Sequence, residues 1–250
     1  MKAKEAVIIT GACGGIGRAL VKAYTEAGYF VLATDSRDAL PEFSEVKFFK
    51  IDLRETVVDI HIREECLGQL RAELVSYKLV ALINNAAEQM VKPIEKVTYE
   101  DWNSVLSVNL LAPFFWAQYF LDLLEESSGS VLNISSIHAR QTKKDFSVYA
   151  TSKAALSGLT RLMSIELGAR IRVNALEPAA ISTQMLESGF EGNPRGRLEL
   201  DSYHPTNRIG TTEEIANVAL FVTSEKCGFL NGASIAVDGG IGNLLHDPAN

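Results

Sequence analysis

Tyr149 and Lys153 are the pair of residues in this sequence whose types and spacing best suit proton transfer. They stand four apart in the segment VYATSKAALSGL, which has a helical pattern, so their side chains share one helix face. A phenol normally ionises at about pH 10, but a neighbouring ammonium group favours the phenolate and lowers this pKa. We therefore expect Tyr149 to act as an acid or base, although an isolated pair at this spacing would more often only pack on a helix surface.

Two further polar residues belong to the same candidate site. Ser136 ends the apolar segment VLNISS, at the carboxyl end of a predicted central strand, where ligands bind in open α/β sheets. Its hydroxyl could donate to a substrate carbonyl, although a serine after a strand is also an ordinary turn former. Asn109 lies within the apolar segment SVNLLAPFFWAQ, so it needs hydrogen-bond partners if buried, and it could hold a water in line with Lys153.

An octapeptide near the start, TGACGGIG from Thr10 to Gly17, follows an apolar run and precedes a helical pattern. Glycines at 11, 15 and 17 permit a sharp turn and a close approach of phosphate to the backbone, and the helix that follows offers unpaired N–H donors. The spacing Gly-x-x-x-Gly-x-Gly is a variant of the commonest dinucleotide fingerprint. The turn predicts a site for a dinucleotide pyrophosphate.

A second predicted strand ends at Asp35, whose carboxylate can accept hydrogen bonds from the ribose hydroxyls of adenosine. The same charge would repel the 2′-phosphate of NADP, and the glycine turn holds no Lys or Arg to neutralise that phosphate. Arg18 and Arg37 are close enough in the sequence to weaken this argument. We expect NAD as the cofactor, with NADP less favoured, and no metal.

Apolar segments that alternate with helical patterns indicate how these residues are positioned. The expected strands are 6–9, 29–34, 46–51, 79–83, 130–134, 171–175 and 233–237. The expected helices are 15–27, 54–76, 99–125, 148–167 and 212–223, of which 54–76 also suits a strand. This alternation predicts a Rossmann-type, doubly wound α/β fold, with a seven-stranded parallel sheet and helices on both faces.

Composition bounds the remaining possibilities. A chain of 250 residues, 47% of them hydrophobic, can bury a large core, and we expect one domain over 1–250. A net charge of −7 with both signs interspersed argues against binding to nucleic acid or to an anionic membrane. Three cysteines without metal-ligand spacing, no signal-like start and no membrane-spanning apolar stretch predict a cytoplasmic protein. The long irregular segment 184–207 is expected to form a substrate lid.

The order and spacing of these motifs resemble those of a classical short-chain dehydrogenase/reductase (SDR). The resemblance spans nearly the whole chain and is carried by TGACGGIG, Asp35, INNAA at 83–87, Asn109, Ser136, Tyr149-x-x-x-Lys153, RVNALEPAAIST at 172–183 and VDGG at 237–240. It implies a catalytic tetrad of Asn109, Ser136, Tyr149 and Lys153, in which Tyr149 moves the proton and Lys153 also holds the nicotinamide ribose. It implies cofactor contacts from Gly11, Gly15, Ile16, Gly17, Asp35, Asp52, Leu53, Asn85, Ala86, Tyr149, Lys153, Pro178, Ile181 and Thr183.

The resemblance also implies a homotetramer or homodimer built on the helices around Asn109 and Tyr149, and for the tetramer on the sheet edge near Val237. Two positions depart from the family pattern, because Ala87 and Ala179 stand where the family has glycine. The added methyl groups could crowd the nicotinamide or restrict the backbone, or they could be harmless.

The expected activity is the NAD-dependent interconversion of a secondary alcohol and a ketone on a small molecule that the sequence does not name. His138, Arg140 and Gln141 stand where the family lines its substrate pocket, and Arg140 would suit an anionic substrate, although a solvent-facing charge explains it equally well. Two alternatives stay open. One is a reductase of 3-oxoacyl thioesters on acyl carrier protein, which would favour NADPH, and the other is a non-enzymatic NAD-binding protein on the same fold.

Overall fold

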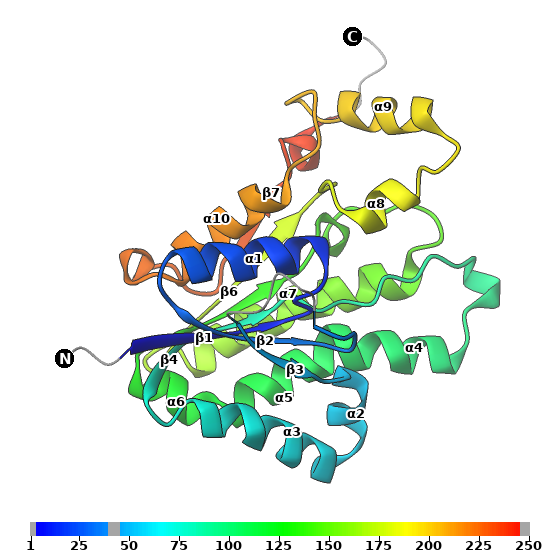
Figure 1. The fold of residues 1–250 in the computed structure, drawn as a ribbon. Coiled ribbons are helices and arrows are strands. Elements are labelled where there is room, and N and C mark those ends of the chain that lie inside the picture. Colours follow the sequence, from blue (N-terminus) through cyan, green and yellow to red (C-terminus); the bar gives the residue numbers. More distant parts are fainter. Residues whose placement is uncertain (1–3, 40–45, 246–250) are drawn as a thin grey trace.

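The computed structural model describes residues 4–39 and 46–245, and seven parallel strands within them form one sheet (Figure 1). The strands are β1 (Lys4–Thr10), β2 (Phe30–Asp35), β3 (Lys47–Lys50), β4 (Tyr77–Asn84), β5 (Ser130–Ile134), β6 (Arg172–Pro178) and β7 (Ser234–Val237). Their spatial order is β3-β2-β1-β4-β5-β6-β7, so the direction of winding reverses between β1 and β4. The expected seven-stranded, doubly wound sheet is confirmed, and its switch point predicts a ligand crevice beyond the ends of β1 and β4.

Helices cover both faces of this sheet (Figure 1). They are α1 (Gly15–Glu26), α2 (Leu53–Val58), α3 (Ile60–Glu73), α4 (Tyr99–Leu106), α5 (Ala112–Tyr119), α6 (Leu121–Glu126), α7 (Ser147–Glu166), α8 (Gln184–Ser188), α9 (Pro194–Ser202) and α10 (Thr212–Thr223). A π-helical turn, Ser107–Leu111, joins α4 to α5. Among the residues described, no helix is both long and apolar enough to cross a bilayer.

Side chains of alternate residues in the central strands pack into two separate hydrophobic cores, one on each face of the sheet. In β1, Val7 and Ile9 pack with α1 and α10, whereas Ala6 and Ile8 pack with α3, α5, α6 and α7 on the opposite face. All four side chains are fully buried. Because side chains alternate along a strand and both faces are covered, an unbroken apolar run is what a central parallel strand requires.

Two expected helices are interrupted. The segment 54–76 forms α2 and α3 rather than one helix, because Asp59 has extended backbone and caps α3 by accepting hydrogen bonds from two of its N–H groups. The segment 99–125 passes through the π-helical turn. Pro113 has no N–H to donate to the carbonyl oxygen of Asn109, four residues earlier, so a regular α-helix cannot continue there.

The sequence predicts an irregular segment over 184–207, but the structure places two short helices there, α8 and α9. Thr183 caps the first of these helices and Asn193 caps the second, each by accepting a backbone N–H hydrogen bond. Arg197 of α9 pairs with Glu187 of α8 (3.1 Å) and joins the two helices. The capping residues are visible in the sequence, but each helix is too short to show a clear hydrophobic period.

Candidate active site

A long groove of about 1680 Å³ runs along the carboxyl ends of the central strands. All the residues expected to contact the cofactor lie in its lining, namely Gly11, Gly15, Ile16, Gly17, Asp35, Asp52, Leu53, Asn85, Ala86, Tyr149, Lys153, Pro178, Ile181 and Thr183. Of the expected tetrad, Ser136, Tyr149 and Lys153 also line it, whereas Asn109 is fully buried. The structure therefore brings the glycine turn and the residues expected to transfer the proton to one groove.

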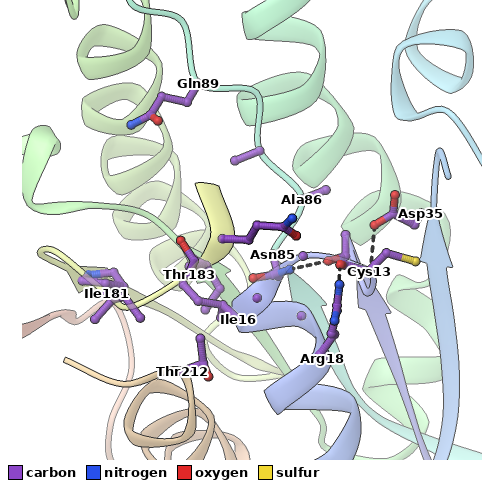
Figure 2. A pocket seen from close by; sticks show the side chains of 18 of the residues that line it. Cys13, Ile16, Arg18, Asp35, Asn85, Ala86, Gln89, Ile181, Thr183 and Thr212 are labelled. Carbon is purple, nitrogen blue, oxygen red and sulfur yellow. Dashed lines mark hydrogen bonds between the residues drawn. The ribbon is translucent and has the colours of Figure 1, made fainter. Parts of the chain in front are cut away.

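The turn after β1 requires glycine for steric reasons. Gly11 has a φ of +66°, and a methyl group at Gly17 would lie 2.1 Å from the carbonyl oxygen of Gly11. A methyl group at Gly15 would lie 2.8 Å from Cγ2 of Thr183, which Figure 2 shows on the groove wall near the start of α1. Gly14, the N-cap of α1, supplies no side-chain acceptor, which leaves the first N–H groups of the helix for an anion in the groove.

Asp35, at the end of β2, is buried and already accepts four hydrogen bonds. They come from the backbone N–H of Cys13 (2.9 Å), drawn in Figure 2, and from the backbone N–H, Nε and Nη2 of Arg37 (3.0, 3.0 and 3.2 Å). Burial alone raises the pKa of Asp35, but the hydrogen bonds from Arg37 and Cys13 together lower it below the usual value. The expected anion is present, with a guanidinium paired to it.

Asn85 connects the end of β4 to the glycine turn. Its Nδ2 donates to the carbonyl oxygens of Thr10 and Gly11, both at 3.0 Å, and its backbone N–H donates to Oγ1 of Thr10 (3.1 Å). The conformation of the turn after β1 is therefore fixed by β4, the strand on the other side of the switch point. Asn85 therefore supports the glycine turn through its amide and its backbone.

Tyr149 and Lys153 lie on the same face of α7, as the spacing predicts. Lys153 Nζ lies 5.7 Å from the centre of the Tyr149 ring and donates to the carbonyl oxygen of Ile134 (2.7 Å). Tyr149 makes a side-chain hydrogen bond with Ser136. The three side chains expected to act on the substrate oxygen are thus held together where β5 ends.

The electrostatics of this group correct one expectation. Burial raises the pKa of Tyr149, and the hydrogen bond with Ser136 only partly opposes the rise. Burial also lowers the pKa of Lys153 to about 7. The sequence predicts a lowered pKa for the phenol, but removal of both groups from water disfavours their charged forms more strongly than their proximity favours them.

Asn109 holds two elements together from within the π-helical turn. Its Oδ1 accepts the backbone N–H of Glu88 (2.8 Å), and its Nδ2 donates to the carbonyl oxygen of Glu88 (3.0 Å) and to Oγ of Ser152 (2.9 Å). Both amide protons are used, so this side chain fixes the segment after β4 against α7. The expected water in line with Lys153 stays a prediction.

Comparison with known proteins agrees with this geometry. A family model described as enoyl-(acyl carrier protein) reductase matches residues 11–242. The chain is 32% identical over 247 residues to a probable 2,4-dienoyl-CoA reductase of Bacillus subtilis (strain 168), a match that covers 95% of this chain and 96% of that relative. The chain belongs to the classical SDR family.

Relatives of this SDR act on different compounds. It is 31% identical over 241 residues to the L-xylulose reductase of Bos taurus, covering 93% of this chain and 94% of the relative. Among solved structures, 4-hydroxyisoleucine dehydrogenase complexed with NADH matches with a TM-score of 0.87 at 27% identity, over 97% of this chain and 100% of the other. The chain is accordingly an oxidoreductase that uses a nicotinamide cofactor on alcohol or carbonyl groups.

Two of the residues expected to line the substrate pocket of the SDR make other contacts. Arg140 pairs through Nε with Oε2 of the buried Glu177 (2.6 Å), and Gln141 donates through Nε2 to the carbonyl oxygen of Gly242 (2.7 Å). Neither lies in the lining of the groove. The charge of Arg140 is neutralised within the protein, which removes the argument for an anionic substrate based on this residue.

His138 belongs to the packing around Tyr149 instead of the groove lining. Its ring stacks on Phe146 with centroids 4.6 Å apart and meets the ring of Tyr149 edge-on at 5.7 Å. Burial, with a smaller contribution from the charge of Lys143, lowers the pKa of His138 to about 4, so the imidazole is neutral at pH 7. It therefore shapes the surroundings of Tyr149 as an aromatic group.

Several lining residues outside the motifs and the expected lid were not identified from the sequence, namely Glu88, Gln89, Val91, Lys143 and Phe146. Phe146 stands three residues before Tyr149, a spacing that puts both on one side of a helix start and could have indicated it. Ala87 and Ala179, the departures from the family pattern, also line the groove. Neither has a positive φ, so their methyl groups strain no backbone.

Proposed function

We propose that this SDR uses NAD(H) to interconvert a secondary alcohol and a ketone on a small molecule. The observation that carries the proposal is the convergence of Ser136, Tyr149 and Lys153 on the groove that also holds the glycine turn. The crowded glycines and the uncapped N-terminus of α1 fit a pyrophosphate, and Asp35 fits the adenosine ribose. When bound, the nicotinamide supplies or accepts the hydride.

The protein's own residues would then handle the proton. In alcohol oxidation, Tyr149 takes the hydroxyl proton while Ser136 donates a hydrogen bond to the same oxygen. In ketone reduction, the Tyr149 phenol gives its proton to the carbonyl oxygen. Its raised pKa keeps it protonated at neutral pH before the cofactor binds, which favours the acid role.

The choice of NAD rests on Asp35, and the solved relative with bound NADH supports it. Arg37 and Arg54, paired with Asp35 and Asp52 at the same end of the groove, are the groups that a 2′-phosphate of NADP would meet. The second candidate function is NADPH-dependent reduction of a 3-oxoacyl thioester, and the Bacillus subtilis relative supports it only in being named as a reductase of a CoA thioester. Fluorescence titration with NADH and NADPH separates the two candidates, and tighter binding of NADPH would contradict the choice of NAD.

Replacement of Tyr149 by Phe tests the catalytic role. Turnover would be measured with L-xylulose, pyruvate and acetoacetyl-CoA, each with NADH and with NADPH, through the absorbance of the reduced nicotinamide. We expect Tyr149→Phe to lower kcat by about 10²–10⁴-fold with little change in the Kd of NADH, because only the proton donor is lost. Tyr99→Phe, an exposed position on α4, is the matched control.

Wild-type rates in Tyr149→Phe would refute the role of the phenol. No turnover of any panel compound by the native protein, despite tight binding of NADH, would instead favour a non-enzymatic NAD-binding protein.

We also propose that the chain is one cytoplasmic domain that acts as a homotetramer or homodimer, and that 184–207 is its substrate lid. Leu186 and Phe190 line the groove, which supports the lid. Leu162 and Ile165 of α7 are 52% and 80% exposed, and large apolar side chains gathered on a helix suit a subunit interface.

A further inference from the structure

Glu177, the penultimate residue of β6, is a buried carboxylate that does not line the groove. Its side chain is 1% exposed. Oε1 accepts a hydrogen bond from Oγ of Ser157 (2.8 Å), and Oε2 pairs with Nε of Arg140 (2.6 Å), whose own side chain is 48% exposed. A half-solvated guanidinium thus reaches inward to a carboxylate that water does not reach. Because an unpaired buried charge is costly, the fold depends on this pair staying closed.

Arg140 joins Glu177 to the loop that carries Ser136. Ser136 is the N-cap of the 3-10 turn Ile137–Ala139, where its Oγ accepts the backbone N–H of His138 (3.1 Å), and Arg140 directly follows this turn. The turn begins just after β5, and its far end is held at the end of β6 by the pair between Arg140 and Glu177. The direction of the Ser136 hydroxyl is therefore set partly by the contact between Arg140 and Glu177.

Ser157 joins the same carboxylate to α7. It lies one helical turn beyond Lys153, and its Oγ is 2.9 Å from Oγ of Ser135, which reaches the carbonyl oxygen of Lys153 at 3.1 Å. Ser157 donates its one hydroxyl proton to the charged Glu177, the strongest acceptor. Ser135 is then the donor toward both Ser157 and the carbonyl oxygen of Lys153, and its single proton is shared between these two acceptors. A single buried carboxylate thus connects the Ser136 loop to the helix that presents Tyr149.

We propose that Glu177 and Arg140 are positioning residues that hold the hydroxyl of Ser136 against Tyr149. This inference rests on the proposed function of Tyr149, but the contact it concerns can be measured without turnover. The hydrogen bond from Ser136 favours the phenolate, so losing that bond raises the pH at which Tyr149 ionises. A pair that only stabilised the fold would leave this ionisation unchanged.

Two variants separate positioning from stability. Glu177→Gln keeps an acceptor for Ser157 but leaves Arg140 without its counter-charge, whereas the double variant Arg140→Met/Glu177→Leu removes both charges and replaces them with apolar packing. The matched control is Glu125→Leu/Arg170→Met, which removes a partly exposed pair between α6 and the turn that precedes β6 (2.6 Å). Each protein is made with and without Tyr149→Phe.

The readout is a titration of each NAD-loaded protein with base. The near-ultraviolet phenolate absorbance, minus that of the same variant carrying Tyr149→Phe, reports Tyr149 alone. We expect the midpoint to rise by about one pH unit in both Glu177 variants and to stay unchanged in the control. We also expect kcat with the best ketone of the panel to fall about tenfold, with the Kd of NADH within about twofold of wild type.

The double variant decides the outcome if Glu177→Gln does not fold. If the double variant keeps the wild-type midpoint, the pair does not position Ser136 against Tyr149 and the inference is overturned, whether or not the unfolding temperature changes. If no panel ketone is turned over by the native protein, the proposed function fails, while the titration still tests the inference on its own.

Discussion

Arg37 occupies acceptor positions on Asp35 that a ribose would need. Arg37→Ala frees the two positions bonded by Nε and Nη2, so we expect NADH to bind about fivefold more tightly. The affinity for NADPH should not increase, because its 2′-phosphate loses the nearest cation and still faces the carboxylate of Asp35. Fluorescence titration measures both, with Arg195→Ala, exposed on α9, as the control. Equal gains for both cofactors would show that Arg37 does not discriminate between them.

Lys153 makes the stability of the protein depend on pH. Burial holds its pKa at about 7, below its ordinary value of 10.5, so the unfolded chain binds more protons than the folded one between these limits. The cost of burying the ammonium is therefore fully present below about pH 7 and is relieved as the pH rises toward 10.5. We expect Lys153→Met to have a higher Tm than wild type at about pH 6, with a difference that shrinks toward about pH 10. A difference independent of pH in thermal unfolding would contradict this account.

At the scale of the element, the turn from β1 into α1 contains two glycines at which an added methyl group should destabilise the protein to very different extents. In Gly17→Ala the new carbon lies 2.1 Å from a backbone oxygen that cannot move aside, whereas in Gly14→Ala the nearest atom is 3.4 Å away. We expect the first to lose more than about 2 kcal/mol of unfolding free energy, together with NADH binding, and the second to lose less than about 1 kcal/mol. Urea unfolding and NADH titration measure both. Similar losses in the two variants would contradict the steric argument.

Element boundaries were the part of the fold least visible in the sequence. The seven strands follow from apolar runs that must be buried on both faces. The π-helical turn and the split at Asp59 depend on one residue each, a proline without an N–H and an aspartate that caps the next helix. Such single contacts leave the hydrophobic period almost unchanged, so the period alone predicts a continuous helix.

At the scale of the whole molecule, the exposed apolar face of α7 predicts self-association. We expect Leu162→Glu/Ile165→Glu to yield a smaller species than wild type in light scattering, because buried charges at an interface are unfavourable. Leu198→Glu, at a 70% exposed position on α9, is the control and should leave the mass unchanged. An unchanged mass in the double variant would place the interface elsewhere.

The sequence determined the sheet and the glycine turn, and its motifs together with the family resemblance indicated part of the groove lining, because these depend on local motifs and on the carboxyl ends of parallel strands meeting at one edge. Only the tertiary structure decided which partners the charged groups have. In the structure, Arg140 pairs with Glu177, Arg37 pairs with Asp35, and Tyr149 and Lys153 are both buried. The physical reason is that desolvation depends on everything packed around a group, which spacing along the chain does not specify.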